Sequence, residues 1–365
     1  MKLVPQTAPY IRKEVSVKRM MLDVIVALLP ITLFAILQNG WNAGYVFLIS
    51  IATMLFFELL IHMFIKWPKG MKIKEFFTKE GFLNVKKTYT ANNITAPLIS
   101  ALIYSLILPA GTKPYVVFIG AAFGIIIGKM VFGGLGNNIF NPAAAGRIFV
   151  SICFTLSYDN GGIDVTAGAT PLGLVKGDLS NTSFYSIGDI FLGNIPGSMG
   201  EVCCILILIG GFYLLLRKSA DFRAIFGYFL AFALVMFVAC ISYYFGVSKD
   251  TSLIEMWAYQ IFSGGALFAA VFMITDPVTS PTSKFGRLFY AVCAGAITAL
   301  IRICGSYTEG AAFSILIMNM FTPCIDYFMR GKPNHYTWKQ SILLCGSLIL
   351  VCGIIVAYIL VGGGR

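Results

Sequence analysis

One short segment of the sequence places a hydroxyl group beside small residues and an acidic residue. Residues 164–172 read Asp-Val-Thr-Ala-Gly-Ala-Thr-Pro-Leu. Gly168 and Ala169 leave the backbone accessible beside the Thr170 hydroxyl, and the Asp164 carboxylate can hold a cation or orient a base. A plain turn between two spans has a similar composition, so the segment alone leaves both interpretations open.

Two cations lie within apolar segments, on either side of a stretch rich in glycine and asparagine. An unpaired charge in hydrocarbon costs at least about 3 kcal/mol on insertion scales, so Lys129 and Arg147 need partners. Together with Asn137, Asn138 and Asn141 they can line a polar pocket. In the alternative interpretation, Lys129 reaches the membrane interface and Arg147 caps a helix end.

Acidic residues in or near apolar segments are candidates for an ion pathway, because a carboxylate can bind Na⁺ or exchange a proton. They are Asp23, Glu58, Asp276, Glu309 and Asp326. Asp276 and Glu309 are the most interesting, since each lies at an interruption of an apolar segment. A carboxylate that is paired for structural reasons, or that lies among lipid headgroups, is the alternative for each.

Other redox and ligand chemistries find little support. The 9 cysteines form no Cys-x-x-Cys pair, and no metal site is expected. The only histidines, His62 and His335, lie near expected helix ends, which argues against a bis-histidine haem. Residues 133–136 do not follow a strand in a βαβ unit, so they are no dinucleotide fingerprint. Electron transfer would therefore require an organic cofactor.

The elements that position these residues are membrane helices. The sequence is 58% hydrophobic and 12% charged, with mean hydropathy +0.83. We predict an all-α polytopic membrane protein, a single domain over residues 1–365 with about ten or eleven spans. The apolar segments are 20–38, 43–65, 94–109, 115–132, 143–157, 200–216, 224–246, 261–274, 287–303, 311–329 and 340–361. Segments 94–109, 143–157 and 261–274 are short and are expected to be tilted, broken or re-entrant.

Positive charge sets the expected orientation. The net charge of +11 comes from lysines and arginines in an N-terminal arm (1–19), a loop (66–90) and later short loops, which alternating spans place on one side. That side is predicted to be cytoplasmic. The loop 158–199, which contains Thr170, then lies on the other side. A partner nucleic acid is not expected, because the basic residues serve orientation.

The sequence also contains two similar units, residues 94–157 and 261–329. Each reads as a short apolar run, a proline break, a long span, a glycine break and another short run. By the span count they enter the membrane from opposite sides, as inverted-repeat units with broken helices do. Interrupted helices are tolerated where protein or a water-filled cavity satisfies the backbone, so a central site is expected. Coincidence in a chain rich in glycine and alanine is the alternative.

Five stretches carry a resemblance to a known family. The chain resembles the D-type membrane component (RnfD) of the Rnf ion-translocating electron-transport complex and its relative, the B-type component of the sodium-pumping NADH:quinone oxidoreductase. The length favours the Rnf component. The matching stretches are 19–24 (Arg-Met-Met-Leu-Asp-Val), 132–138 (Phe-Gly-Gly-Leu-Gly-Asn-Asn), 140–143 (Phe-Asn-Pro-Ala), 168–172 (Gly-Ala-Thr-Pro-Leu) and 275–281 (Thr-Asp-Pro-Val-Thr-Ser-Pro).

The resemblance implies that a flavin transferase attaches FMN through its phosphate to Thr170. Asp164, Gly168 and Ala169 belong to that motif, while Ala167 stands where the family usually has Ser or Thr. The resemblance also implies a non-covalent riboflavin. The polar pocket around the asparagines is a candidate for it.

Together these expectations describe a membrane subunit of a ferredoxin:NAD oxidoreductase that moves Na⁺ or H⁺ across a bacterial cell membrane. The subunit is expected to be inactive alone. Partner subunits would supply the iron–sulfur, NAD-binding and second flavin centres. Two other classes stay open: a flavin-free solute transporter or channel, which suits inverted repeats equally well, and a structural anchor for other subunits. A flavinylated Thr170 distinguishes the redox subunit from both.

Overall fold

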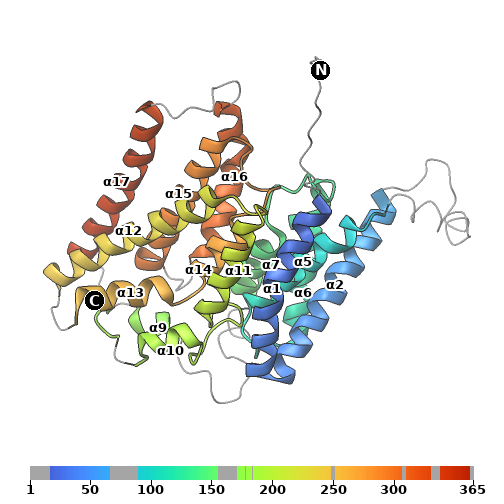
Figure 1. Ribbon diagram of the computed structural model, residues 1–365, viewed down its shortest axis with the longest axis horizontal. Coiled ribbons are helices and arrows are strands. Elements are labelled where there is room, and N and C mark those ends of the chain that lie inside the picture. The colour runs from blue at the N-terminus through green and yellow to red at the C-terminus, as the bar shows by residue number, and fades with distance from the viewer. Residues whose placement is uncertain are drawn as a thin grey trace, which may run out of the picture.

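The computed structural model describes residues 17–65, 89–154, 171–176, 178–182, 184–247, 251–305, 310–329 and 338–361. Across these ranges the regular elements are all helices, and they pack side by side as a bundle (Figure 1). The predicted all-α fold is therefore confirmed. The arm 1–16, most of the basic loop 66–90 and residues 155–170 lie outside the described residues.

Seven helices are long enough and apolar enough to cross the hydrocarbon core of a membrane. They carry large apolar side chains on their outer faces, such as Leu37 and Phe226, which suits contact with lipid. The seven are α1 (Val17–Asn39), α2 (Trp41–Ile65), α6 (Pro114–Gly128, continued by η1, Met130–Phe132), α12 (Phe222–Gly246), α15 (Lys284–Cys304), α16 (Ala311–Met329) and α17 (Trp338–Leu360).

The remaining predicted spans are shorter or bent. They are α5 (Asn92–Leu106), α7 (Pro142–Cys153), α11 (Cys204–Leu216) and the pair α13 (Leu253–Phe262) with α14 (Ala266–Phe268) and η3 (Ala269–Met273). This last pair is bent by 57° and forms an eighth candidate span. The predictions that 94–109 and 143–157 are short and that 261–274 is broken are confirmed.

The predicted apolar segment 200–216 coincides with α11, but the helix begins only at Cys204 and has 13 residues. The chain before it is held in turns by tertiary hydrogen bonds. Met199 N–H donates to Leu108 O at 3.1 Å, and Gly200 N–H donates to Leu106 O at 2.7 Å. These bonds satisfy carbonyls at the end of α5 that its own helix leaves free.

The bundle has two distinct ends. At the basic end, α1 begins, α2 ends and α17 begins, near the connections 217–223 and 275–283 (Figure 1). At the opposite end lie the short helices α9 (Pro171–Val175) and α10 (Ile187–Leu192). Gln38 in α1 donates to Gly193 O at 2.6 Å there. The basic residues that the structure describes in the connection 217–223 and at the start of α15 lie at this end, as predicted, whereas its cytoplasmic placement stays a prediction.

The two halves of the chain pack in the same pattern. In the first half, α2 contacts α5 and α6, and α6 contacts α7; in the second half, α12 contacts α13 and α15, and α15 contacts α16. The halves meet where α1 contacts α11 and where α7 contacts α16. α2 ends at the basic end, whereas its counterpart α12 begins there after the connection 217–223, and this opposite direction is what an inverted repeat requires. Within the described residues, α5 is continuous despite Pro97, so only the second half contains a bent helix pair.

Glycines allow the closest helix contacts. A Cβ atom on Gly124 would lie 2.4 Å from Pro142 O, so α6 and α7 touch through their backbones. A Cβ on Gly295 would lie 2.3 Å from Tyr228 O, so the backbones of α15 and α12 are also in direct contact. Small residues serve this purpose in membrane helices, where packing replaces the hydrophobic effect as the main attraction.

Candidate functional site

A pocket lies at the basic end, between the two halves; we call it the central pocket. It is open on one side, and α1, α5, the segment 129–142 and the loop 275–278 contribute to its wall. The wall is mainly apolar with a few polar groups, as the walls of ligand pockets commonly are. The polar residues of the wall are Ser100, Lys129, Asn138, Asn141, Ser219, Thr275 and Asp276.

A buried ion pair closes one side of the central pocket. Lys129, at the end of α6, places its Nζ 2.6 Å from Oε2 of Glu58 on α2, and both side chains are 3% exposed. The sequence predicted that Lys129 needs a partner, and the structure supplies Glu58. Lys129 is buried inside the bundle, and its position relative to the membrane interface stays a prediction. An ion that uses Glu58 Oε2 as a ligand would compete with this lysine.

Asp276 lies in the loop that follows η3 and stabilises the turn there. Its carboxylate accepts from Val278 N–H and from the Thr279 hydroxyl, both at 3.1 Å. The side chain lines the central pocket and attracts Lys129 through space. Among the candidate acids that the structure describes, Asp276 therefore faces both the pocket and its buried cation.

Of the three asparagines predicted to form the pocket, two line it, and one of these two also caps α7. Asn141 is the N-cap of α7, because its Oδ1 accepts from Ala143 N–H at 3.0 Å and from Ala144 N–H at 3.4 Å. Asn141 also lines the pocket, so the positive end of the α7 dipole faces it. Asn138 is buried in the wall, whereas Asn137 is exposed and outside it.

Arg147 lies further along α7 and does not line the central pocket. Its guanidinium donates to the Ser151 hydroxyl at 2.8 Å. The pocket predicted from sequence thus forms around Lys129, Asn138 and Asn141 without Asn137 and Arg147.

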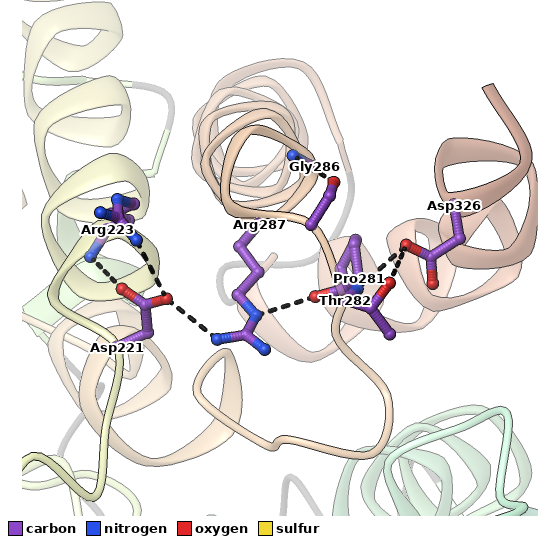
Figure 2. Close-up of polar contacts among 8 residues, drawn as sticks. Asp221, Arg223, Pro281, Thr282, Gly286, Arg287 and Asp326 are labelled. Carbon is purple, nitrogen blue, oxygen red and sulfur yellow. Dashed lines mark hydrogen bonds and ion pairs between the residues drawn. The ribbon is translucent and has the colours of Figure 1, made fainter. Parts of the chain in front are cut away.

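A polar network holds the loop that carries Asp276 (Figure 2). Arg287 donates through Nε to Pro281 O at 2.8 Å and through Nη1 to Asp221 at 3.0 Å. Asp326 on α16 accepts from the Thr282 N–H at 2.9 Å and from its hydroxyl at 3.0 Å. Three separate parts of the second half therefore fix the loop 275–283 against the pocket.

Asp23 ties α1 to the chain after α11. It accepts from Arg217 Nη2 at 3.1 Å and from the Ser219 hydroxyl. Asp23 and Asp326 thus both have local partners at the basic end. Their part in an ion pathway stays a prediction.

Thr170, the expected modification site, is the residue before α9 in the sequence, and α9 lies at the end of the bundle opposite the basic end. Asp164, Gly168, Ala169 and Thr170 fall outside the described residues, as does Glu309. The chain is described again from Pro171, which begins α9. Pro171 and Leu172 are buried and line a small indentation together with Ile195, Pro196, Gly197, Glu201 and Gly264. Gly264 lies at the bend between α13 and α14.

A model of the NQR2, RnfD, RnfE family matches residues 4–335. The chain belongs to this family. The match covers most of the sequence, and it includes both the central pocket and the segment before Pro171. The resemblance identified from five short stretches is confirmed.

Individual members of the family extend the comparison. The D component of the proton-translocating ferredoxin:NAD(+) oxidoreductase complex of Clostridium ljungdahlii is 30% identical over 337 residues, 89% of this chain and 93% of that protein. The B component of the Na(+)-translocating NADH-quinone reductase of Chromohalobacter salexigens is 36% identical over 239 residues, 63% of this chain and 57% of that protein. The Klebsiella pneumoniae protein of the same name is 27% identical and covers 89% of this chain and 88% of its own length.

Sequence reasoning missed a buried arginine in this family member. Arg302, near the end of α15, is 6% exposed, and its Nη1 donates to Gln260 O at 2.6 Å and to Ser263 O at 3.4 Å. Its guanidinium also lies over the Phe232 ring, 4.9 Å from the centroid. The rule that singled out Lys129, a charge inside an apolar segment, also applies to Arg302 and would have found it.

Proposed function

We propose that the chain is the D-type membrane component of a redox-driven, ion-translocating complex, with FMN attached to Thr170. The relative from Clostridium ljungdahlii, named as the D component of a proton-translocating oxidoreductase complex, matches over 93% of its length. Partner subunits would bring the iron–sulfur and NAD-binding centres and a second flavin subunit, and a flavin transferase would load the FMN. The complex would lie in a bacterial cell membrane with the N-terminus of this chain in the cytoplasm.

The observation that carries this proposal is the place of Pro171. This residue directly follows Thr170, and it is buried at the end of the bundle opposite the basic loops. By the positive-inside rule, that end faces away from the cytoplasm. A threonine hydroxyl beside Gly168 and Ala169 is a suitable acceptor for a phosphoester, because small neighbours leave room for the flavin transferase.

FMN bound in this way supplies chemistry that the amino acids lack, since its ring accepts and releases one or two electrons. The chain contributes an anchor. Leu172 packs at Gly264 on the bend of α13 and α14, so the residues after the attachment point are fixed to the bundle.

The central pocket suits a second, non-covalent flavin such as riboflavin. It opens at the basic end and is bounded by α1, α5, the segment 129–142 and the loop 275–278. Its apolar wall matches a flat aromatic ring, and Lys129, Asn138 and Asn141 provide polar contacts on one side. Lys129 keeps its charge close to the pocket because Glu58 holds it there.

Asp276 is the acid that we favour for coupling to Na⁺ or H⁺. It faces the central pocket, whereas Glu58 is paired with Lys129 and Asp23 with Arg217. A neutral Asp276→Asn variant should lower ion transport more than it lowers electron transfer in the assembled complex. Equal losses in both, or none, would remove Asp276 from the coupling step.

In-gel fluorescence tests the FMN proposal. The chain is produced together with a flavin transferase, denatured and separated on a gel. The wild-type band should fluoresce and the Thr170→Ala band should be dark. Thr166→Ala, four residues earlier in the same segment, is the matched control and should fluoresce like the wild type. A dark wild-type band, or a fluorescent Thr170→Ala band, contradicts the proposal.

A second candidate function is a flavin-free transporter or channel. The bent pair α13–α14 and a pocket between two halves favour it, because solute transporters place their sites in such positions. The same gel decides between the two functions, since the wild-type band of a flavin-free transporter should not fluoresce.

A further inference from the structure

The residues that follow the expected modification site are packed into the bundle. Pro171 is buried at the start of α9, Leu172 is 5% exposed, and Val175, one turn later, is 1% exposed. These three side chains lie on one side of the short helix. We call residues 171–175 the docked segment. Thr170 is joined to it by a single peptide bond.

Leu172 lies in a seat formed by other parts of the chain. The seat consists of the segment 195–201 and the bend between α13 and α14. Met199 and Gly200, within that segment, donate hydrogen bonds to carbonyls at the end of α5. The seat therefore does not rely on α9 to hold its backbone in place.

The contact between the docked segment and the bend is close because the bend carries a glycine. Gly264 has a φ of +76°, which side chains rarely allow, and a Cβ atom there would lie 2.2 Å from Leu172 Cδ1. The leucine thus packs against bare backbone. An alanine at position 264 would push Leu172 out of the seat.

Attachment of FMN to Thr170 is a phosphoryl-type transfer with defined bonds. The threonine Oγ attacks the flavin-side phosphorus of a flavin adenine dinucleotide and forms a new O–P bond. The bond from this phosphorus to the bridging oxygen of the diphosphate breaks, adenosine monophosphate leaves, and the hydroxyl proton passes to a base. No electron is transferred. The attacking and leaving oxygens have to lie in line, which requires the acceptor to sit inside the transferase active site.

A transferase that encloses the Thr170 hydroxyl also has to accommodate the next residues. In the packed chain Pro171 and Leu172 are covered by the bundle, so the transferase and the seat compete for them. α9 has 5 residues, too few for a helix that is stable on its own. Once Leu172 leaves the seat, the segment loses its helix and can follow the surface of the transferase.

We propose that Thr170 is modified before Pro171 and Leu172 pack into the seat, so that the transferase acts on the undocked segment and the packed chain is a poor substrate. Packing then holds the loaded segment against the bundle. This order rests on the proposed attachment of FMN to Thr170, and it adds which form of the chain the transferase recognises.

The order in which chain and transferase meet tests the proposal. One wild-type preparation is produced together with the transferase. The other is produced without it, purified in detergent, and then incubated with transferase, flavin adenine dinucleotide and Mg²⁺, with in-gel fluorescence read over time. The first should be modified fully. The second should react about tenfold more slowly, or slower still, than a Leu172→Ala chain treated in the same way, because truncating a buried leucine favours local opening by at least that factor.

Two more variants separate opening from sequence recognition. Gly264→Ala leaves the segment itself unchanged and should react as fast as Leu172→Ala. Leu192→Ala truncates an exposed leucine of α10 at the same end and should react like the wild type. If Leu172→Ala is slow because the transferase reads that leucine, Gly264→Ala decides: a fast reaction supports the proposal and a slow one overturns it.

A purified wild-type chain that reacts as fast as Leu172→Ala and Gly264→Ala also overturns the proposed order, while FMN on Thr170 would still stand. A dark band in both wild-type preparations instead contradicts the attachment itself. The two failures are therefore distinguishable in one experiment.

Discussion

The ion pair beside the central pocket makes a strong prediction about stability. Lys129→Met keeps a side chain of similar length but removes the cation, so Glu58 is left buried without its partner. The two charged groups are 2.6 Å apart and each is 3% exposed, which makes this a buried pair. Lys129→Met should therefore destabilise the chain strongly.

The expected size follows from measured buried pairs. Removal of one partner from such a pair costs about 3–5 kcal/mol, because the remaining charge loses its compensation. At about 2 °C per kcal/mol, the lower limit for large domains, the melting temperature should fall by roughly 6–10 °C. Asp276 also loses an attractive charge, which adds to the effect.

Thermal unfolding of the purified chain in detergent measures this change. The double variant Lys129→Met with Glu58→Gln should recover most of the loss, since it removes both charges together. Arg223→Gln is the control, because its pair with Asp221 is longer, at 3.8 Å, and more exposed. It should shift the melting temperature little. If Lys129→Met melts like the wild type, or the double variant is worse than Lys129→Met, the pair does not contribute as argued.

Three further predictions concern the scaffold around the site. Gly295→Ala should lower the melting temperature strongly, because the added Cβ would lie 2.3 Å from Tyr228 O; an unchanged melting curve would refute that close contact. Asn141→Ala should cost about 1 kcal/mol through the lost cap of α7, and Asn141→Asp should restore the loss. Arg287→Gln should weaken ligand retention in the central pocket with a smaller effect on melting, which flavin release on dilution would measure; retention equal to wild type would contradict it.

Much of the fold could be predicted from hydropathy. Every predicted span coincides with a helix or with the bent pair, because the composition of an apolar segment is a local property. The late start of α11 could not be predicted. It depends on hydrogen bonds from Met199 and Gly200 to the end of α5, about ninety residues away in the chain.

The candidate site was predictable only in part, for the same reason. A charge in an apolar segment indicates that Lys129 needs a partner, but the choice of Glu58 follows from how α2 packs on α6. Likewise, the sequence shows two adjacent asparagines without showing which one turns inward. The structure buries Asn138 and exposes Asn137, because the turn 133–140 fixes their directions. The part played by Thr170 stays a prediction.

Peptide mass mapping of the purified chain tests the central claim most directly. After production with a flavin transferase and proteolysis, the peptide that contains Thr170 should be heavier by one FMN less one water, and fragmentation should place the added mass on that threonine. In the Thr170→Ala variant the corresponding peptide should be unmodified. An unmodified wild-type peptide, or an FMN on any other residue, would contradict the account of this chain as an electron carrier.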